Sequence, residues 1–227
     1  MRKTELYFDS ISDDFEVRMN AFDLAARVAW FDRALSAHAV ARGTLVDVGA
    51  GLGQFSAVGQ RHGATVIPVD IAPRLVHRLR ARFPAATIAS ATDLPFVAGS
   101  MDFVVSSECV EHTNDPERAV GEMLRILKPG GVLFLTTPNL VWRWSVGLAE
   151  LLRLRKFAGI ENWLSRRALR RILVGSGAQV LGSTGLHVLP FQLTPLRPLI
   201  RLVNHHGQWL KPLMINQCWV ARKRLSA

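Results

Sequence analysis

The chain has 227 residues, of which 49% are hydrophobic, and this length suits one well-buried domain better than two. Its net charge of +10 is unevenly placed, because residues 1–140 carry 14 Lys and Arg against 16 Asp and Glu, whereas residues 141–227 carry 14 against 2. Acidic residues interrupt the first 15 positions, and no apolar run approaches the roughly 20 residues of a membrane-spanning helix, which argues against a secretion signal and a transmembrane anchor.

Helices and strands alternate along the first 140 residues. Apolar residues at helical spacing predict a first helix from Phe15 to Ala41. The predicted strands that follow are 44–48, 65–70, 86–90, 101–107 and 132–139, and the predicted helices between them are 53–62, 73–83 and 116–127. Asn114 or Asp115 is expected to cap the last of these helices. Short aliphatic strands alternating with helices predict a mostly parallel sheet covered on both faces.

The pattern is less regular after Asn139. The segment LVWRWSVGLAELLRLRKF predicts an amphipathic helix, and a second helix is predicted from Ser165 to Val174. AQVLGST is read as a strand, the proline-rich stretch Leu186–Pro212 as an insertion, and MINQCWVARK as the final strand.

The segment VDVGAGLGQF places glycines at every second position after a strand, and the next strand ends at Asp70. A bare turn that opens a helix lets backbone N–H groups approach a ligand, and a carboxylate at the end of the next strand can accept both hydroxyls of a ribose. The spacing G-x-G-x-G differs from the usual G-x-G-x-x-G of dinucleotide sites, although a dinucleotide remains an alternative.

Five motifs in a fixed order resemble class I S-adenosylmethionine-dependent methyltransferases. They are VDVGAGLGQF, VIPVD, ATDLPF, SMDFVVSSECVEH and EMLRILKPGGVLFLTTPN. The group with an LPF…EH…LKPGG pattern, which includes many small-molecule methylases, is the most similar, over about residues 40–140. The resemblance implies a Rossmann-like α/β fold with a seven-stranded, mostly parallel sheet, an antiparallel last strand and helices on both faces.

The resemblance also implies a cofactor site for S-adenosylmethionine. The cofactor-binding residues that it implies are Tyr7, Asp47, Gly49, Ala50, Gly51, Gly53, Asp70, Ile71, Ser90, Ala91, Ser107 and Glu108. Asp70 would hold the ribose, Ile71 would pack on the adenine, and Tyr7 would lie in a lid segment or serve only as an anchoring aromatic. Many relatives have an acid where this chain has Ser90, which accepts a hydrogen bond without charge and predicts lower cofactor affinity.

The stretch ECVEH supplies the candidate catalytic groups. His112 is the candidate general base, with Glu111 beside it, because an imidazole titrates near neutral pH. Alternatively, Glu111 and His112 only brace the following helix, since EH recurs in relatives with different acceptors. E-x-x-E-H also resembles a metal-binding stretch of certain methyltransferases, which would make Glu108, Glu111, His112 and Glu161 ligands of Mg²⁺.

Tryptophans interleave with arginines in the basic last third. Trp142, Trp144, Trp163 and Trp209 are compatible with a membrane interface, with stacking on RNA bases, or with a pocket or core. The basic excess equally fits an arginine-rich solvated surface. His187 begins the variable insertion and is expected to be a surface histidine more often than a substrate contact.

Together these features predict one methyltransferase domain spanning 1–227. Residues 1–42 would form a helical lid, 43–139 the cofactor-binding core, and 140–163 and 186–212 insertions on the acceptor side. The predicted reaction is O-methylation of a small hydrophobic, glycosylated or lipid-linked acceptor. The alternatives are a metal-assisted RNA methyltransferase and a non-catalytic partner subunit that binds the cofactor. Cys109 and Cys218 lie in apolar stretches typical of strands, so reduced thiols and a cytoplasmic location, with peripheral contact to the inner membrane face as an option, are expected.

Overall fold

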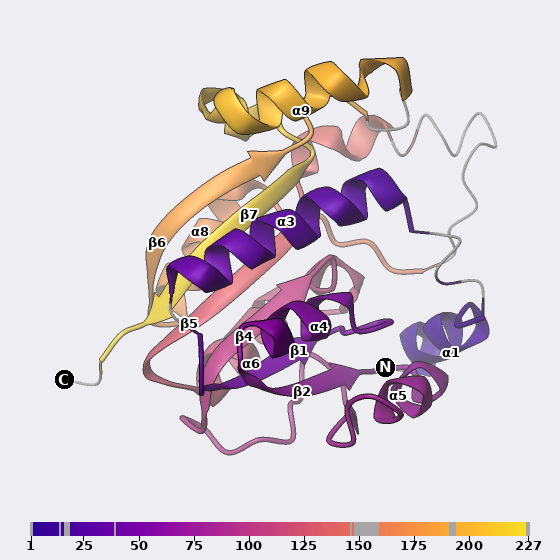
Figure 1. The fold of residues 1–227 in the computed structure, drawn as a ribbon, viewed down its shortest axis with the longest axis vertical. Helices are drawn as coiled ribbons and strands as arrows, with labels where there is room; N and C mark the ends of the chain where they lie inside the picture. Colours follow the sequence, from indigo (N-terminus) through magenta and orange to yellow (C-terminus); the bar gives the residue numbers. More distant parts are fainter. Residues whose placement is uncertain are drawn as a thin grey trace.

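A seven-stranded sheet forms the centre of the molecule (Figure 1). The computed structural model describes residues 2–13, 15, 19–38, 40–145, 147, 159–190 and 194–225. The strands are β1 (Thr44–Val48), β2 (Thr65–Asp70), β3 (Thr87–Ile88), β4 (Met101–Ser107), β5 (Leu127–Pro138), β6 (Ala178–Leu186) and β7 (Asn216–Lys223). Their order is β3-β2-β1-β4-β5-β7-β6; β1 to β5 run parallel, and β7 runs antiparallel to its neighbours β5 and β6. The predicted Rossmann-like sheet is confirmed.

Helices cover both faces of the sheet. The helices on one face are α3 (Ala21–Ala37), α4 (Gln54–Arg61) and α5 (Pro73–Arg80), and those on the other face are α6 (Pro116–Ile126) and α8 (Arg166–Gly175). Helix α1 (Arg2–Ser10) lies against α5, and α9 (Arg197–His206) lies across one end of the molecule (Figure 1). The 3-10 turns are η1 (Val110–His112), η2 (Leu140–Trp142), η3 (Thr194–Leu196) and η4 (Gln208–Leu213).

The central strands carry largely apolar runs because both of their faces are buried. In β5, Leu133 and Leu135 join the core beneath α6 and α8, whereas Val132 and Phe134 join the core beneath α3 and α4. Successive strand residues point to opposite faces, so a continuous aliphatic run fills two cores at once. Each such side chain contributes about 1.5–3 kcal/mol when it is fully buried.

The N-terminal region differs from the prediction. Helix α3 begins at Ala21 and not at Phe15, because the Asn20 side chain accepts hydrogen bonds from the backbone N–H groups of Phe22 and Asp23 and so caps the helix there. Helix α1 is a separate element that the polar composition of the first residues did not reveal. The predicted cap of α6 is confirmed, since Asp115 accepts from the Arg118 N–H.

The remaining differences lie in the edges and insertions. The third strand is reduced to Thr87–Ile88, and the proline-rich insertion contains α9 and η4. Residues 146 and 148–157 of the helix predicted after Asn139 lie outside the described residues, and the described part begins with η2. Cys109 and Cys218 are free thiols, the first of them just after β4 and not within a strand. Among the described helices, none is long and apolar enough to cross a bilayer.

Candidate active site

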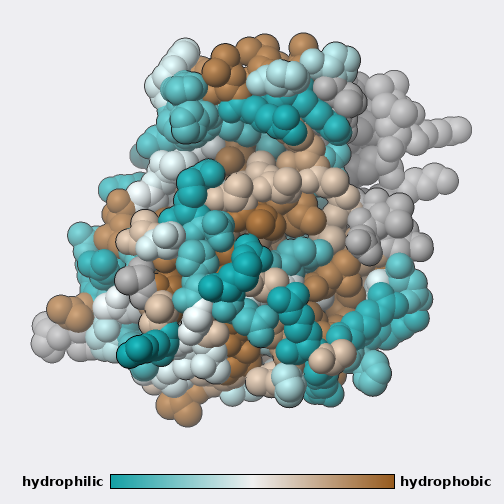
Figure 2. Space-filling view, viewed as in Figure 1, coloured by the Kyte–Doolittle hydropathy of each residue, from teal (hydrophilic) through white to brown (hydrophobic). Residues whose placement is uncertain are grey.

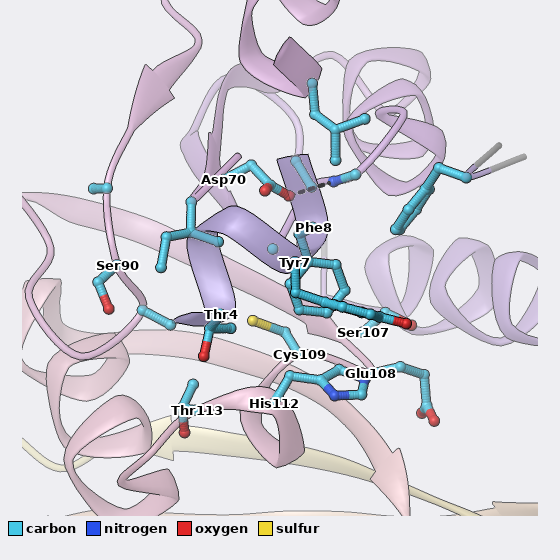
Figure 3. A pocket seen from close by; sticks show the side chains of 18 of the residues that line it. Thr4, Tyr7, Phe8, Asp70, Ser90, Ser107, Glu108, Cys109, His112 and Thr113 are labelled. Carbon is cyan, nitrogen blue, oxygen red and sulfur yellow. Dashed lines mark hydrogen bonds between the residues drawn. The ribbon is translucent and has the colours of Figure 1, made fainter. Parts of the chain in front are cut away.

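A cavity of about 540 Å³ lies at the carboxyl edge of the parallel strands. Its walls come from α1 and the residues just after it, from α3, from the turns after β1 and β2, from the segment after β3, and from the end of β4 with η1 (Figure 3). Ligands of open α/β sheets bind in the crevice at this edge. The predicted site residues that line the cavity are Tyr7, Gly49, Ala50, Gly51, Asp70, Ile71, Ser90, Ala91, Ser107, Glu108 and His112.

The glycine-rich turn after β1 has two reasons to lack side chains. Gly49, Gly51 and Gly53 all have positive φ, at 77°, 54° and 80°. A Cβ on Gly49 would lie 2.5 Å from the Cys109 Sγ, and one on Gly53 would lie 2.7 Å from a methyl of Leu79. Gly53 thus packs against α5 and does not line the cavity, in contrast to Gly49 and Gly51.

Asp70 joins this turn to the one after β2. Its Oδ2 accepts a hydrogen bond from the Gly51 N–H at 2.8 Å, drawn as a dashed line in Figure 3, and its Oδ1 accepts from the Ala72 N–H at 2.9 Å. Burial raises the pKa of this carboxyl, and the backbone donors act against that rise. A carboxylate offers about four acceptor positions, so both oxygens can accept further hydrogen bonds from a ligand in the cavity.

Asp47 lies behind the glycine turn, and it is not among the lining residues. It is fully buried; Ser56 donates to its Oδ2 at 2.6 Å, while its Oδ1 has no hydrogen-bond partner among the described residues. Burial raises the pKa of Asp47 to about 7.

The segment after β3 forms the far wall. Ser90 and Ala91 line the cavity together with Ile71 and Leu75. The Ser90 Oγ lies 2.8 Å from the Thr92 Oγ1 and also accepts from the Thr92 N–H at 3.3 Å. An apolar slot with the hydroxyls of Ser90 and Thr92 at its edge suits a flat, weakly polar group.

Glu108 lies where β4 ends. It has a positive φ of 52°, which is uncommon for a residue with a side chain, and its Oε1 is buried without a hydrogen-bond partner among the described residues. Burial, followed by the neighbouring Glu111, raises the pKa of Glu108 to about 8. The group is therefore mostly uncharged at neutral pH.

His112 lines the cavity, and the segment that contains Ile160 holds its ring in place. Its Nδ1 lies 2.9 Å from the carbonyl oxygen of Ile160, which only accepts, so the proton is assigned to Nδ1 and the lone pair to Nε2. Its ring meets the ring of Phe8 of α1 in an edge-to-face arrangement, with ring centroids 5.3 Å apart.

Glu111 supports this loop and does not line the cavity. It is 2% exposed, the Thr137 hydroxyl donates to its Oε2, and its backbone oxygen accepts from the Asn162 N–H at 2.6 Å. Burial raises its pKa to about 7.

The four predicted metal ligands do not form a metal site. Glu111 Oε1 lies 4.0 Å from His112 Nε2, and Glu161 lies in the adjacent segment, where its backbone oxygen accepts from Arg143. Across the described ranges, no group of three or more His, Cys, Asp and Glu is arranged to hold a metal ion. The charge of Glu161 instead contributes to the raised pKa of Glu111.

A buried ionic network, absent from the prediction, reaches the cavity from α3. The Arg27 guanidinium lies 2.8 Å from Asp23, donates to the Ser107 hydroxyl at 2.9 Å and lines the cavity. Asp23 in turn lies 3.1 Å from the Nε2 of His187, which is fully buried. The expectation of a surface histidine is therefore wrong: α9 covers His187, and Asn204 of α9 accepts from its backbone N–H. In the sequence, the sign of this network was that Asp23 and Arg27 lie four residues apart on a helix face that is otherwise filled by apolar residues such as Trp30 and Leu35.

The N-terminal wall of the cavity is apolar. Phe8, Ile11 and Phe15 line it, together with Tyr7 of α1 and Phe55 of α4. Sequence reasoning identified only Tyr7 among them, because the lining residues straddle the end of a helix that it did not predict. No lining residue comes from the described parts of 140–163 or 186–212.

Comparison with known proteins agrees with this architecture. Residues 46–135 match the family model of a methyltransferase domain. An uncharacterised methyltransferase of Mycobacterium sp. strain KMS is 39% identical over 122 residues, which are 51% of this chain and 47% of the relative. The chain spans about half the length of such curated relatives.

Solved structures share the fold. An S-adenosylmethionine-dependent methyltransferase from Mesorhizobium loti aligns with a TM-score of 0.64 and 20% identity, over 86% of this chain and 98% of that one. The [4+2]-cyclase SpnF aligns with a TM-score of 0.60 and 20% identity, over 86% and 81%, so the fold by itself does not fix the reaction. The family model over residues 46–135, the sequence relatives and the fold all agree: this part of the chain is a methyltransferase domain with the fold of class I S-adenosylmethionine-dependent methyltransferases.

Proposed function

We propose that this chain binds S-adenosylmethionine in the cavity and catalyses transfer of its methyl group to a hydroxyl oxygen of a small hydrophobic acceptor. The observation that carries the proposal is the carboxylate of Asp70, which is fixed by two backbone N–H groups and lines the cavity beside the bare turn at Gly51. A family that uses this cofactor supplies the identity of the ligand.

The chain's residues fit the parts of such a ligand. Asp70 would accept from the two ribose hydroxyls, and the turn at Gly49–Gly51 would leave room for the amino acid portion. Ile71 and Ala91 would pack on the purine, with Ser90 near its edge. When bound, the cofactor supplies an electrophilic methyl group on a sulfonium. Glu108, with a pKa raised to about 8, is mostly protonated at neutral pH, whereas Asp47, with a pKa of about 7, is about half ionised.

His112 is the proposed general base. The carbonyl of Ile160 holds the proton on Nδ1, which leaves Nε2 as the basic nitrogen, and in this proposal Nε2 takes the proton of the acceptor hydroxyl. Glu111 is a positioning residue, since it fixes η1 through Thr137 and Asn162. General bases of this kind typically contribute about 10²- to 10⁴-fold to the rate.

The apolar wall indicates the acceptor class. Phe8, Ile11, Phe15 and Phe55 offer contact area and few hydrogen bonds, which suits an acceptor with an aromatic or aliphatic body. Within this proposal, residues 1–42 act as a cover over the 43–139 core. The roles of 140–163 and 186–212 in the acceptor site stay a prediction.

Isothermal titration of the whole chain with S-adenosylmethionine tests the proposal. We expect binding by the wild type and a loss of affinity of about tenfold to a hundredfold in Asp70→Asn, because charge-assisted hydrogen bonds to the ribose become weaker.

Asp32→Asn is the matched control. Asp32 makes surface contacts with Arg61 and His62 on the far side of α3, and its replacement should leave affinity unchanged. Equal affinity in wild type and Asp70→Asn, with both proteins folded by circular dichroism, would refute the cofactor assignment.

A further inference from the structure

The end of the molecule formed by α9 and η4 exposes large apolar side chains. Leu199 and Leu202 are 48% and 57% exposed, and Trp209 and Leu213 are 78% and 53% exposed. Figure 2 shows the resulting apolar patch along the top of the molecule, over α9, with hydrophilic atoms beside it. We call these four residues and the cations among them the α9–η4 surface.

This exposure is fixed by how α9 is attached. Ile200 is fully buried, and the Asn204 side chain accepts from the His187 N–H at 2.7 Å. Gln208 donates to the backbone oxygens of Asn204 and Gly185 and accepts from the Gly185 N–H. Because these contacts hold one side of the helix on β6, Leu199 and Leu202 cannot turn inward.

Cations and no acids accompany the apolar residues. Arg197 and Arg201 lie over the ring of Phe22 at 5.1 and 5.3 Å, and Lys211 donates to the backbone oxygen of Ser183. Residues 194–213 contain no Asp or Glu. The positive charges therefore lie uncompensated by acids of their own segment.

The same surface continues onto η2 and the residue pair after it. The indole of Trp142 donates to the Leu213 backbone oxygen at 2.7 Å and stacks on Trp144 at 5.9 Å. Trp144 is 63% exposed, and Arg143 is exposed between the two tryptophans. Aromatic residues at the edge of an aliphatic patch, with Arg and Lys around it, are typical of proteins that lie in a membrane interface.

We propose that the α9–η4 surface docks on an anionic lipid bilayer. Leu199, Leu202 and Leu213 would enter the acyl boundary, and Arg201 and Lys211 would meet the headgroups. RNA fits less well, because it would use the tryptophans and cations but would leave Leu199, Leu202 and Leu213 without a partner. A second copy fits less well too, because a symmetric contact would bring the same cations face to face without acids.

The position of the surface relates it to the cavity. η2 follows the end of β5, and η4 precedes β7, whose Asn216 pairs with Pro138 at the carboxyl end of β5. The cavity opens at the same edge, beside the end of β4. A bilayer bound here would present apolar acceptors at the catalytic edge. This last step rests on the proposed function, whereas the docking itself does not.

Co-sedimentation of the full chain with vesicles tests the docking. We expect binding to vesicles of phosphatidylcholine with phosphatidylglycerol, weak binding to phosphatidylcholine alone, and release at high salt. Leu199→Ser/Leu202→Ser/Trp209→Ser should lower the partition coefficient at least about tenfold at every salt concentration. Arg201→Gln/Lys211→Gln should lower it about tenfold at low salt and flatten its salt dependence.

The matched control is Val97→Ser/Leu225→Ser, which removes side chains 78% and 76% exposed elsewhere on the molecule and should bind like wild type. All variants should keep the wild-type affinity for S-adenosylmethionine, so that a failure of docking is distinguishable from a failure of the cofactor site. No binding by wild type, equal binding to neutral vesicles, or unchanged binding by the triple variant would overturn the proposal. The proposal would also be overturned if the triple variant still bound vesicles and lost only RNA binding or only self-association.

Discussion

Gly49 shows, at the scale of one residue, two separate costs of adding a methyl group. Its φ of 77° is strained for any side chain, and its Cβ would also lie 2.5 Å from Cys109 Sγ. Gly99 has a similar φ of 70° with no atom within 4 Å of its Cβ position. Both positions therefore carry the cost of a left-handed backbone, and only Gly49 also carries the cost of a steric overlap.

Gly49→Ala should be more destabilising than Gly99→Ala. Left-handed backbone costs about 1–2 kcal/mol at either site, and overpacking adds about 1–3 kcal/mol at Gly49 only. Urea denaturation of both variants, with unchanged m-values, measures the difference in the free energy of unfolding. Equal losses would mean that Cys109 moves aside without cost.

Single residues of the site differ in how far the sequence predicts them. The sequence predicted that Asp70, Gly49 and Gly51 share one site, and they line the same cavity, because their positions depend on local spacing. The protonation of Glu108 and the contacts of Arg27 depend on burial by distant segments, which no spacing encodes. Arg27 meets Ser107 across 80 positions of sequence.

Helix α3 carries a buried and an exposed acid, which allows a comparison within one element. Burial alone would raise the pKa of Asp23, but the charge of Arg27 and the contact with His187 keep it below its ordinary value. Asp32, on the same helix, has a side chain 49% exposed and pairs with Arg61.

Asp23→Ala should therefore cost about 3–5 kcal/mol of unfolding free energy, because it leaves the Arg27 charge buried without its partner. Asp32→Ala should cost less than about 1 kcal/mol, as exposed pairs do. Chemical denaturation of both variants compares them. A loss at Asp23 no larger than that at Asp32 would contradict the view that the network supports the fold.

Elements were predictable where periodicity is strong. Strands β1, β2 and β4 have aliphatic runs that burial on two faces demands, and α6 has a cap and an apolar stripe. Helix α1 was missed because its inner face covers a cavity and not a core, so its sequence RKTELYFDS lacks a continuous apolar stripe. Helix α9 was hidden for the opposite reason, since its apolar residues lie on both sides of the helix, Ile200 buried and Leu199 and Leu202 exposed.

Several carboxyl groups of the molecule are buried where ionisation is unfavourable. Burial raises the pKa of Asp47 and Glu111 to about 7, and burial with Glu111 raises that of Glu108 to about 8. Asp and Glu in an unfolded chain titrate near 4. At pH values between about 4 and the folded pKa values of about 7 to 8, the folded state therefore holds more protons than the unfolded chain.

The free energy of unfolding should therefore fall as pH rises from about 5 to about 8. The contribution of these three groups is fully present below about pH 4 and is lost as pH passes through their folded pKa values. Asp102 and Glu122, with lowered pKa values, titrate below this window. His38 has a lowered pKa, which gives the opposite slope near pH 6, but it is one partly exposed ring against three carboxyls.

We expect a decrease of about 2 kcal/mol or more across this range, or several degrees in Tm. Thermal unfolding of the cofactor-free chain at a series of pH values measures it. Glu108→Gln should flatten the upper part of the curve, because it removes the group that titrates last. A stability that is constant or rises with pH would show that these carboxyls are already ionised in the folded protein, with water or a rearranged loop as their partner.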